Sequence, residues 1–187
     1  STLFAISSAN AAIFDSTPEN PVPLPEFRVD LKQTSVSGVS SGAYFAAQFH
    51  VAWSRYFVGA GIFSGGPWGC SLDNYVVSRD IPYMDQCMQG PISNQRFNAV
   101  VQRAHTKSAA GTIDPIEELQ NDKIFVSYGT ADKTVSSSVS ERIIDFYAEL
   151  GVPSDNLADI SVTNNMAPDG APMGHAIPTD SFVTNAV

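Results

Sequence analysis

Apolar and polar residues follow two different patterns along the chain, one typical of β-strands and one typical of α-helices. Four short runs of apolar or β-branched residues predict β-strands. They cover residues 34–37, 56–63, 123–128 and 157–162. Three segments with apolar residues at helical spacing predict α-helices. They cover residues 43–49, 94–107 and 137–150, and a short helical turn is expected at 114–119. Ser93 is placed to cap the second helix and Gly151 to end the third. Strands that alternate with helices indicate right-handed crossovers and a parallel sheet.

The N-terminal residues follow neither pattern. Residues 12–27 hold four prolines without a sustained period, which indicates an extended lead-in outside the core. Residues 3–6 are apolar, and Ala9-Asn10-Ala11 has the small-x-small form of a signal-peptidase site, so the remnant of an export signal is expected here. A plain N-terminal tail is the alternative. We therefore divide the chain into a tail, residues 1–27, and one domain, residues 28–187.

Composition narrows the range of partners. Hydrophobic residues make up 43% of the chain, which is enough to bury a core. Nineteen Asp and Glu residues against ten Lys and Arg residues give a net charge of -9, which disfavours nucleic acid and anionic membrane surfaces. Three scattered histidines and two cysteines show no metal-ligand spacing, and we see no phosphate-binding glycine loop, so neither a metal nor a cofactor is expected. The sequence leaves the oligomeric state open.

Both cysteines, Cys70 and Cys87, fall in one long segment without obvious secondary structure, residues 64–92. A disulfide between them would order this segment and stabilise the fold by roughly 3 kcal/mol, because it restricts the unfolded chain. Such a bridge also agrees with export to a secreted or periplasmic location. Two buried thiols are the alternative.

A candidate nucleophile lies between the first predicted strand and the first predicted helix. Gly38-Val39-Ser40-Ser41-Gly42 has the Gly-x-Ser-x-Gly form of a nucleophile elbow, in which small neighbours make room for a strained turn. The pattern is short, and its position between strand and helix is what favours Ser40 as a nucleophile. The backbone N–H of Ser41, at the helix N-terminus, is a candidate donor to an oxyanion.

A serine nucleophile needs a histidine base. His50 lies among apolar residues of a predicted helix, where a structural role is expected, and His105 lies at a helix end, where a solvated or capping role is expected. His175 follows the last predicted strand in a loop, the position that this architecture requires of the base.

The base needs an acid to orient it. Asp132 directly follows the strongest strand of the second half of the chain, and open α/β sheets place their functional residues at the carboxyl ends of strands. Asp169, close to His175 in the sequence, is the rival, and a turn-forming role for Asp132 is the structural alternative. The order Ser40, Asp132, His175 is the one expected for an α/β-hydrolase triad.

Aromatic residues of the long segment are candidates for substrate binding. Trp68, with Tyr75 and Tyr83, is expected either to form an apolar platform near the active edge or to pack as a satellite cluster under the loop. Tyr44, which follows the elbow, is a further candidate for contact with substrate.

Four segments of the chain resemble polyhydroxybutyrate (PHB) depolymerases of the single-domain, circularly permuted type. They are residues 35–48 around the serine, 61–70 after the second strand, 129–135 around Asp132 and 174–180 around His175. The resemblance implies an α/β-hydrolase-like fold with a mostly parallel sheet, helices on both faces and a permuted chain order. It also implies that Ser40 is the nucleophile, Asp132 the orienting acid and His175 the base.

The chain departs from that family at its end. In the family, further strands follow the histidine and bring the second oxyanion donor and part of the substrate groove, whereas here seven residues follow Asp180. We therefore expect an incomplete sheet, with residues 28–187 forming the N-terminal part of the catalytic domain.

Three functions are open at this point. The preferred one is a secreted serine esterase that hydrolyses short-chain polyhydroxyalkanoate, or its oligomers, through an acyl-enzyme on Ser40. The second keeps the triad but acts on feruloyl or acetyl esters of polysaccharides, because the fold does not fix the substrate. The third is a noncatalytic hydrolase-like fragment or binding module.

Overall fold

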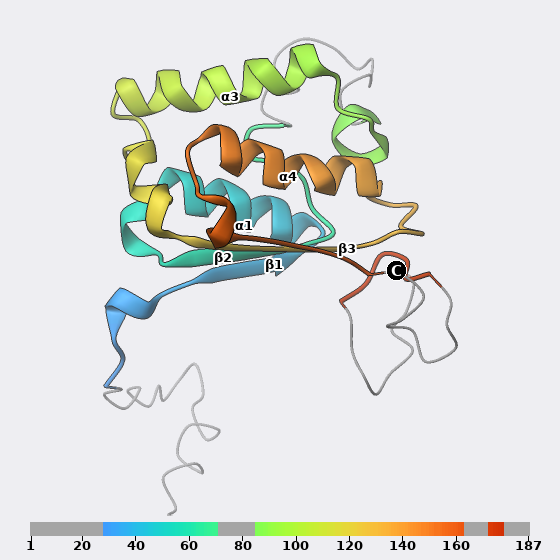
Figure 1. The fold of residues 1–187 in the computed structure, drawn as a ribbon, viewed down its shortest axis with the longest axis horizontal. Coiled ribbons are helices and arrows are strands. Elements are labelled where there is room, and N and C mark those ends of the chain that lie inside the picture. Colours follow the sequence, from blue (N-terminus) through green and yellow to red (C-terminus); the bar gives the residue numbers. More distant parts are fainter. Residues whose placement is uncertain (1–27, 71–84, 163–171, 178–187) are drawn as a thin grey trace, which may run out of the picture. The chain divides into compact units, whose positions relative to one another are not determined.

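The computed structural model describes residues 28–70, 85–162 and 172–177 (Figure 1). The chain divides into two compact units, Ser1–Asp30 and Leu31–Val187, and the elements that follow belong to the second. The expected signal remnant and Pro-rich lead-in lie outside the described residues, as do Tyr75, Tyr83 and Asp169.

Within the described residues, four parallel strands form the sheet, in the order β1-β2-β3-β4. They are β1 (Val36–Val39), β2 (Gly59–Phe63), β3 (Lys123–Gly129) and β4 (Leu157–Val162). The predicted parallel sheet is confirmed. Strand β2 begins later than predicted, because Ser54–Tyr56 form a 3-10 turn, and β1 extends to the residue before Ser40.

In the part of the chain that the structure describes, three long helices connect these strands. They are α1 (Ser41–Ala52), α3 (Asn94–Ala109) and α4 (Ser137–Glu149). The predicted cap of α3 is confirmed, because the Ser93 hydroxyl accepts a hydrogen bond from the Arg96 N–H at 3.3 Å. Helix α4 ends before Gly151, whose φ of 90° is the left-handed conformation that glycine adopts readily.

Short helical segments complete the description. These are the 3-10 turns Leu31–Gln33, Ser54–Tyr56, Ile116–Asn121 and Ser154–Asn156, and the π-helical turn Asp85–Gln89. In the turn Ile116–Asn121, Leu119 is fully buried and belongs to the core.

One hydrophobic core fills the space between the sheet and the helices. In β3, Ile124, Val126 and Tyr128 alternate toward it, as the period of a strand requires. Helix α1 contributes small residues, including Ala43 and Ala47, which let it approach the sheet closely. Burying each larger aliphatic side chain in this core contributes about 1.5–3 kcal/mol.

The described helices all lie on the same side of the sheet (Figure 1). Helices α1 and α4 lie next to the strands, and α3 packs outside them. The sequence predicts helices on both faces, and the described helices account for one of these faces. On the other side a shallow hollow of about 400 Å³ lies over β1, β2 and β3, where the rings of Phe63 and Phe125 lie 5.7 Å apart.

Cys70 and Cys87 form a disulfide, with their Cα atoms 5.9 Å apart, so the predicted bridge is confirmed. Among the described residues, no helix is long and apolar enough to cross a membrane. The same described ranges show no group of three or more His, Cys, Asp or Glu residues able to hold a metal ion.

Candidate active site

Ser40 occupies a strained turn between β1 and α1. Its φ of 57° and ψ of -124° are unusual for a residue with a side chain, and such a conformation costs on the order of 1–3 kcal/mol. The Ser40 N–H donates to the carbonyl of Phe63 at 3.0 Å, which continues the β1–β2 pairing. The Ser40 carbonyl accepts from the N–H groups of Ala43 at 2.9 Å and Tyr44 at 3.1 Å, which begins the helix.

The glycines around Ser40 differ in how much the turn needs them. A Cβ added at Gly38 would lie 2.2 Å from the carbonyl oxygen of Gly42, so this position admits only glycine without a shift of the backbone. A Cβ at Gly42 would meet nothing within 4 Å. The crowding that the nucleophile elbow predicts is therefore found at Gly38, where β1 touches the first turn of α1.

Asp132 and His175 form a buried pair beyond the end of β3. The His175 Nδ1 lies 2.7 Å from Asp132 Oδ2, and the residues are 6% and 9% exposed. The other carboxylate oxygen, Oδ1, accepts hydrogen bonds from the N–H groups of Thr134 and Val135, each at 2.8 Å. These contacts fix the carboxylate and hold the imidazole by Nδ1, which leaves Nε2 as the nitrogen for proton transfer.

A close backbone approach brings His175 to Asp132. The N–H of Ala131 donates to the carbonyl of Met173 at 3.0 Å. A Cβ at Gly129, the last residue of β3, would lie 2.1 Å from that same carbonyl oxygen. Glycine is therefore required at the end of β3, so that the segment with His175 can pass directly over it.

Ser40 and Asp132 follow strands that end at the same edge of the sheet. Strands β1 and β3 are parallel and are separated by β2, so their carboxyl ends lie on the same side. Within the described residues no hydrogen bond joins Ser40 to His175, whereas His175 and Asp132 are bonded. Serine–histidine hydrogen bonds of this kind are often long without substrate.

The first N–H groups of α1 are available for an oxyanion. The N–H of Ser41 is the first of the helix and has no intrahelical acceptor, whereas the N–H groups of Ala43 and Tyr44 already bond to the Ser40 carbonyl. The positive end of the helix dipole lies at the same place. Ser41 stays the predicted oxyanion donor.

Of the two predicted substrate-binding aromatics, Trp68 is buried and Tyr44 is half-buried. Trp68 is 2% exposed and its ring stacks on Phe146 at 6.2 Å between centroids, so it offers no face to a substrate here. Tyr44 is half-buried and its hydroxyl donates to the carbonyl oxygen of Cys87. Burial, and next the negative charge of Asp132, raise the pKa of Tyr44.

His50 lies in a second polar cluster, at the other end of α1. Its Nδ1 lies 3.0 Å from the Tyr147 hydroxyl and its Nε2 lies 3.0 Å from Asp122 Oδ2, and all three residues are buried. These contacts give His50 the structural role predicted for it. His105 is exposed on α3, as expected.

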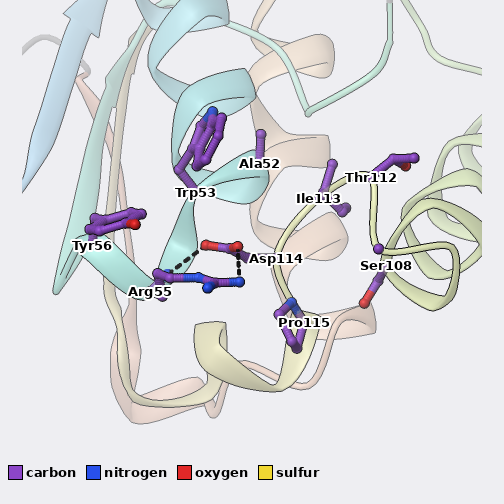
Figure 2. Close-up of a pocket in the computed structure, with 10 residues that line it drawn as sticks. Ala52, Trp53, Arg55, Tyr56, Ser108, Thr112, Ile113, Asp114 and Pro115 are labelled. Carbon is purple, nitrogen blue, oxygen red and sulfur yellow. Dashed lines mark hydrogen bonds and ion pairs between the residues drawn. The ribbon is translucent and has the colours of Figure 1, made fainter.

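A surface pocket of about 370 Å³ lies beyond the C-terminal end of α1 (Figure 2). Exposed rings of Trp53 and Tyr56 lie on one side of it, and Arg55 forms an ion pair with Asp114 in the middle. Because Ser40 precedes the opposite end of this helix, the pocket is separate from the candidate active site.

Sequence reasoning missed the residues that support the candidate triad. Neither the N–H groups of Thr134 and Val135 nor the bond from Tyr44 to Cys87 was expected. A turn after a strand-end Asp is a readable signal for the first, because Asp side chains bond to N–H groups two residues on. The Tyr44 contact spans 43 residues and has no local signal.

The chain is similar to two curated proteins named as depolymerases. No family model matches the chain. It is 35% identical over 152 residues to a poly(3-hydroxybutyrate) depolymerase of Delftia acidovorans, an alignment covering 79% of the chain and 29% of the relative. It is 36% identical over 159 residues to a polyhydroxybutyrate depolymerase of Talaromyces funiculosus, covering 84% of the chain and 41% of the relative. The chain thus spans less than half the length of these relatives.

Solved structures give the same result. The crystal structure of a PHB depolymerase from Penicillium funiculosum matches with a TM-score of 0.66 and 32% identity, over 85% of this chain and 44% of that one. A PHB depolymerase complexed with an R3HB trimer matches with the same TM-score and 31% identity, over 85% and 44% of the two chains. The predicted resemblance to PHB depolymerases and the α/β-hydrolase-like fold are confirmed.

Proposed function

We propose that this chain is the part of a serine ester hydrolase that carries the catalytic triad, and that it acts on short-chain polyhydroxyalkanoate or its oligomers. The observation that carries the proposal is the buried His175–Asp132 pair, at 2.7 Å, at the same sheet edge as the strained Ser40 turn. The relatives named PHB depolymerases favour a hydroxybutyrate polyester over feruloyl or acetyl esters.

The first half of the reaction forms an acyl-enzyme. His175 Nε2 takes the proton from the Ser40 hydroxyl as Oγ attacks the ester carbonyl. Negative charge then develops on the carbonyl oxygen, where the N–H of Ser41 donates. The C–O bond to the alcohol breaks, and the leaving alkoxide receives the proton from His175, so that the acyl group remains on Ser40.

The second half releases the acid. Water attacks the acyl carbonyl while His175 Nε2 takes its proton, and the same proton returns to Ser40 Oγ when the acyl bond breaks. Asp132 stays ionised throughout, because its role is to hold His175 by Nδ1 and to stabilise the imidazolium. Its two backbone donors, Thr134 and Val135, keep the carboxylate in that orientation.

An exported location completes the proposal. The disulfide between Cys70 and Cys87 favours an oxidising compartment, because cytosolic thiols are kept reduced. Export also suits a polyester outside the cell, because an insoluble polymer does not cross a membrane.

Turnover of a hydroxybutyrate oligomer by the purified chain tests the proposal. The variants are Ser40→Ala and, as a matched control in the same turn, Ser41→Ala, which keeps its backbone N–H. We expect Ser40→Ala to lose turnover by several orders of magnitude and Ser41→Ala to keep most of it. Equal turnover by the parent chain and Ser40→Ala would rule out Ser40 as the nucleophile.

A further inference from the structure

We propose that Tyr44 is a positioning residue. Through the disulfide-bonded turn, it joins the helix that follows the nucleophile to the loop that carries the catalytic acid. The turn is Asp85–Gln89, here called the disulfide turn, and the loop is residues 132–136, here called the acid loop. This inference rests on the proposed function, since it assigns a role within the same triad.

Tyr44 connects the helix to the disulfide turn. It lies in the first turn of α1, where its N–H donates to the Ser40 carbonyl at 3.1 Å. Its hydroxyl donates to the carbonyl oxygen of Cys87, within the disulfide turn. A Cβ added at Gly66 would lie 2.6 Å from the Tyr44 ring, so the ring lies against bare backbone and has little room to move.

The disulfide turn in turn contacts the acid loop at two points. The carbonyl of Met88 accepts from the Ser136 N–H at 2.7 Å. The side-chain amide of Gln89 donates to the carbonyl of Thr134 at 3.2 Å. The N–H of Thr134 itself donates to Asp132 Oδ1 at 2.8 Å, so a shift of the disulfide turn displaces a donor to the catalytic carboxylate.

The far side of the turn is anchored by the disulfide. Cys87 is bonded to Cys70, which closely follows β2. The carbonyl of Cys70 accepts from the guanidinium of Arg96, and the carbonyl of Gly69 accepts from Arg103 at 3.2 Å. The disulfide turn is therefore linked to α3 through its disulfide partner Cys70, and to α1 through Tyr44, the described side chain of α1 that bonds to it.

Electrostatics support this placement of the tyrosine. After burial, the charge of Asp132 is the next cause that raises the pKa of Tyr44, so the phenol lies within the field of the catalytic acid. The neutral phenol is thereby favoured, and a neutral phenol is the donor that the Cys87 carbonyl requires.

Steady-state kinetics on a soluble short-chain p-nitrophenyl ester test the proposal first. Tyr44→Phe removes the hydroxyl and keeps the ring, and the control is Tyr56→Phe, an exposed tyrosine beyond the other end of α1. We expect Tyr44→Phe to lower kcat roughly threefold to tenfold, the effect of one hydrogen bond, with KM unchanged. Unchanged kcat, or an effect on KM alone, would overturn the proposal.

A double-mutant cycle tests whether Tyr44 acts through the disulfide turn. The disulfide is removed by Cys70→Ser with Cys87→Ser, with and without Tyr44→Phe. If the two act through one turn, the effect of Tyr44→Phe on kcat shrinks when the disulfide is absent. Effects that simply multiply would overturn the coupling. Gln89→Ala, at an exposed side chain, is the second variant should Tyr44→Phe fail to fold, and it should lower kcat in the same direction.

A spectroscopic readout separates this inference from the proposed function. The proton between His175 Nδ1 and Asp132 gives a low-field NMR signal that does not depend on turnover. We expect Tyr44→Phe to broaden or shift this signal and Tyr56→Phe to leave it unchanged. A parent chain without esterase activity would count against the proposed function alone, whereas an unchanged signal in Tyr44→Phe would overturn the positioning role.

Discussion

Two buried His–Asp pairs lie toward opposite ends of α1, and they differ in what remains free. In the pair at the C-terminal end, both ring nitrogens of His50 have partners, Tyr147 and Asp122. In the pair near the N-terminal end, His175 uses Nδ1 for Asp132, and no described residue bonds its Nε2. A His–Asp pair can act as a base only where one nitrogen remains available and a nucleophile is near, so the first pair stabilises the fold and the second is suited to catalysis.

The two acids differ in the same sense. Asp132 accepts two backbone N–H bonds in addition to its bond to His175, so its carboxylate keeps two donors when the histidine moves. The described side-chain partner of Asp122 is His50, inside the core. Asp132, with its additional donors, is therefore suited to catalysis. Burial of Asp122 is favourable only while His50 is present as its partner.

The largest expected effect comes from exchanging the acids one at a time. Asp132→Asn should lower kcat roughly 10⁴-fold, because the amide no longer selects the His175 tautomer that leaves Nε2 free as a base. Asp122→Asn should leave kcat close to that of the parent chain and lower the free energy of unfolding by about 1–3 kcal/mol. Steady-state kinetics and urea unfolding measure the two effects. Similar losses of kcat in both variants would remove the distinction between the pairs.

Removing the histidines should have the opposite order of effects on stability: the loss of His50 should cost more free energy of unfolding than the loss of His175. His50→Leu leaves the Asp122 carboxylate buried without its partner and should lower the free energy of unfolding by about 3–5 kcal/mol. His175→Ala should lower it by less, because Thr134 and Val135 still bond Asp132. Urea denaturation of both variants measures this difference, and a larger loss for His175→Ala would contradict it.

Alanine substitutions of two glycines, at the nucleophile end of α1, should have opposite effects on stability. Gly38→Ala places a Cβ 2.2 Å from the Gly42 carbonyl oxygen and should destabilise the fold by roughly 1–3 kcal/mol while displacing Ser40. Gly42→Ala, within α1 and with nothing near its Cβ, should stabilise the helix by about 0.5–1 kcal/mol. Thermal unfolding and esterase assays on the pair measure both effects. A stable, active Gly38→Ala variant would show that the turn is looser than described.

A smaller effect is expected from Tyr147, the partner of His50, as a pH dependence of stability. Burial, and next the charge of Asp122, raise the pKa of Tyr147 above its ordinary value of about 10. The folded state then binds more protons than the unfolded state above about pH 10, so the free energy of unfolding falls as the pH rises past that value. Tyr147→Phe should lose about 1 kcal/mol at neutral pH and show a shallower alkaline decline. Unfolding midpoints between pH 8 and pH 11 measure it, and parallel pH profiles would contradict it.

The sheet and its helices follow from local sequence patterns. Strand β4 has the predicted bounds, α3 begins after the predicted cap, and Asp132 was identified by its place after β3. Such features depend on residue periodicity and on the geometry of parallel sheets, both of which are visible within a few residues.

The remaining features depend on contacts between distant residues. His50 bonds to Asp122 and Tyr147 across 72 and 97 residues, so its partners have no local signal. Trp68 was expected either to form a substrate platform or to pack under the loop, and it packs on Phe146. Tyr44 was predicted to contact substrate, and tertiary packing holds its hydroxyl against Cys87. Aromatic residues near an active site are as well suited to packing as to binding, and the sequence does not separate these uses.

Covalent labelling directly tests whether Ser40 is a nucleophile that His175 activates. The purified chain is treated with a fluorophosphonate, which reacts with an activated serine, and the adduct is mapped by peptide mass spectrometry. We expect one adduct, on Ser40, that is lost in His175→Ala and kept in His50→Gln, because only the first substitution removes the proposed base. An adduct on another serine, or labelling of Ser40 that does not depend on His175, would contradict it.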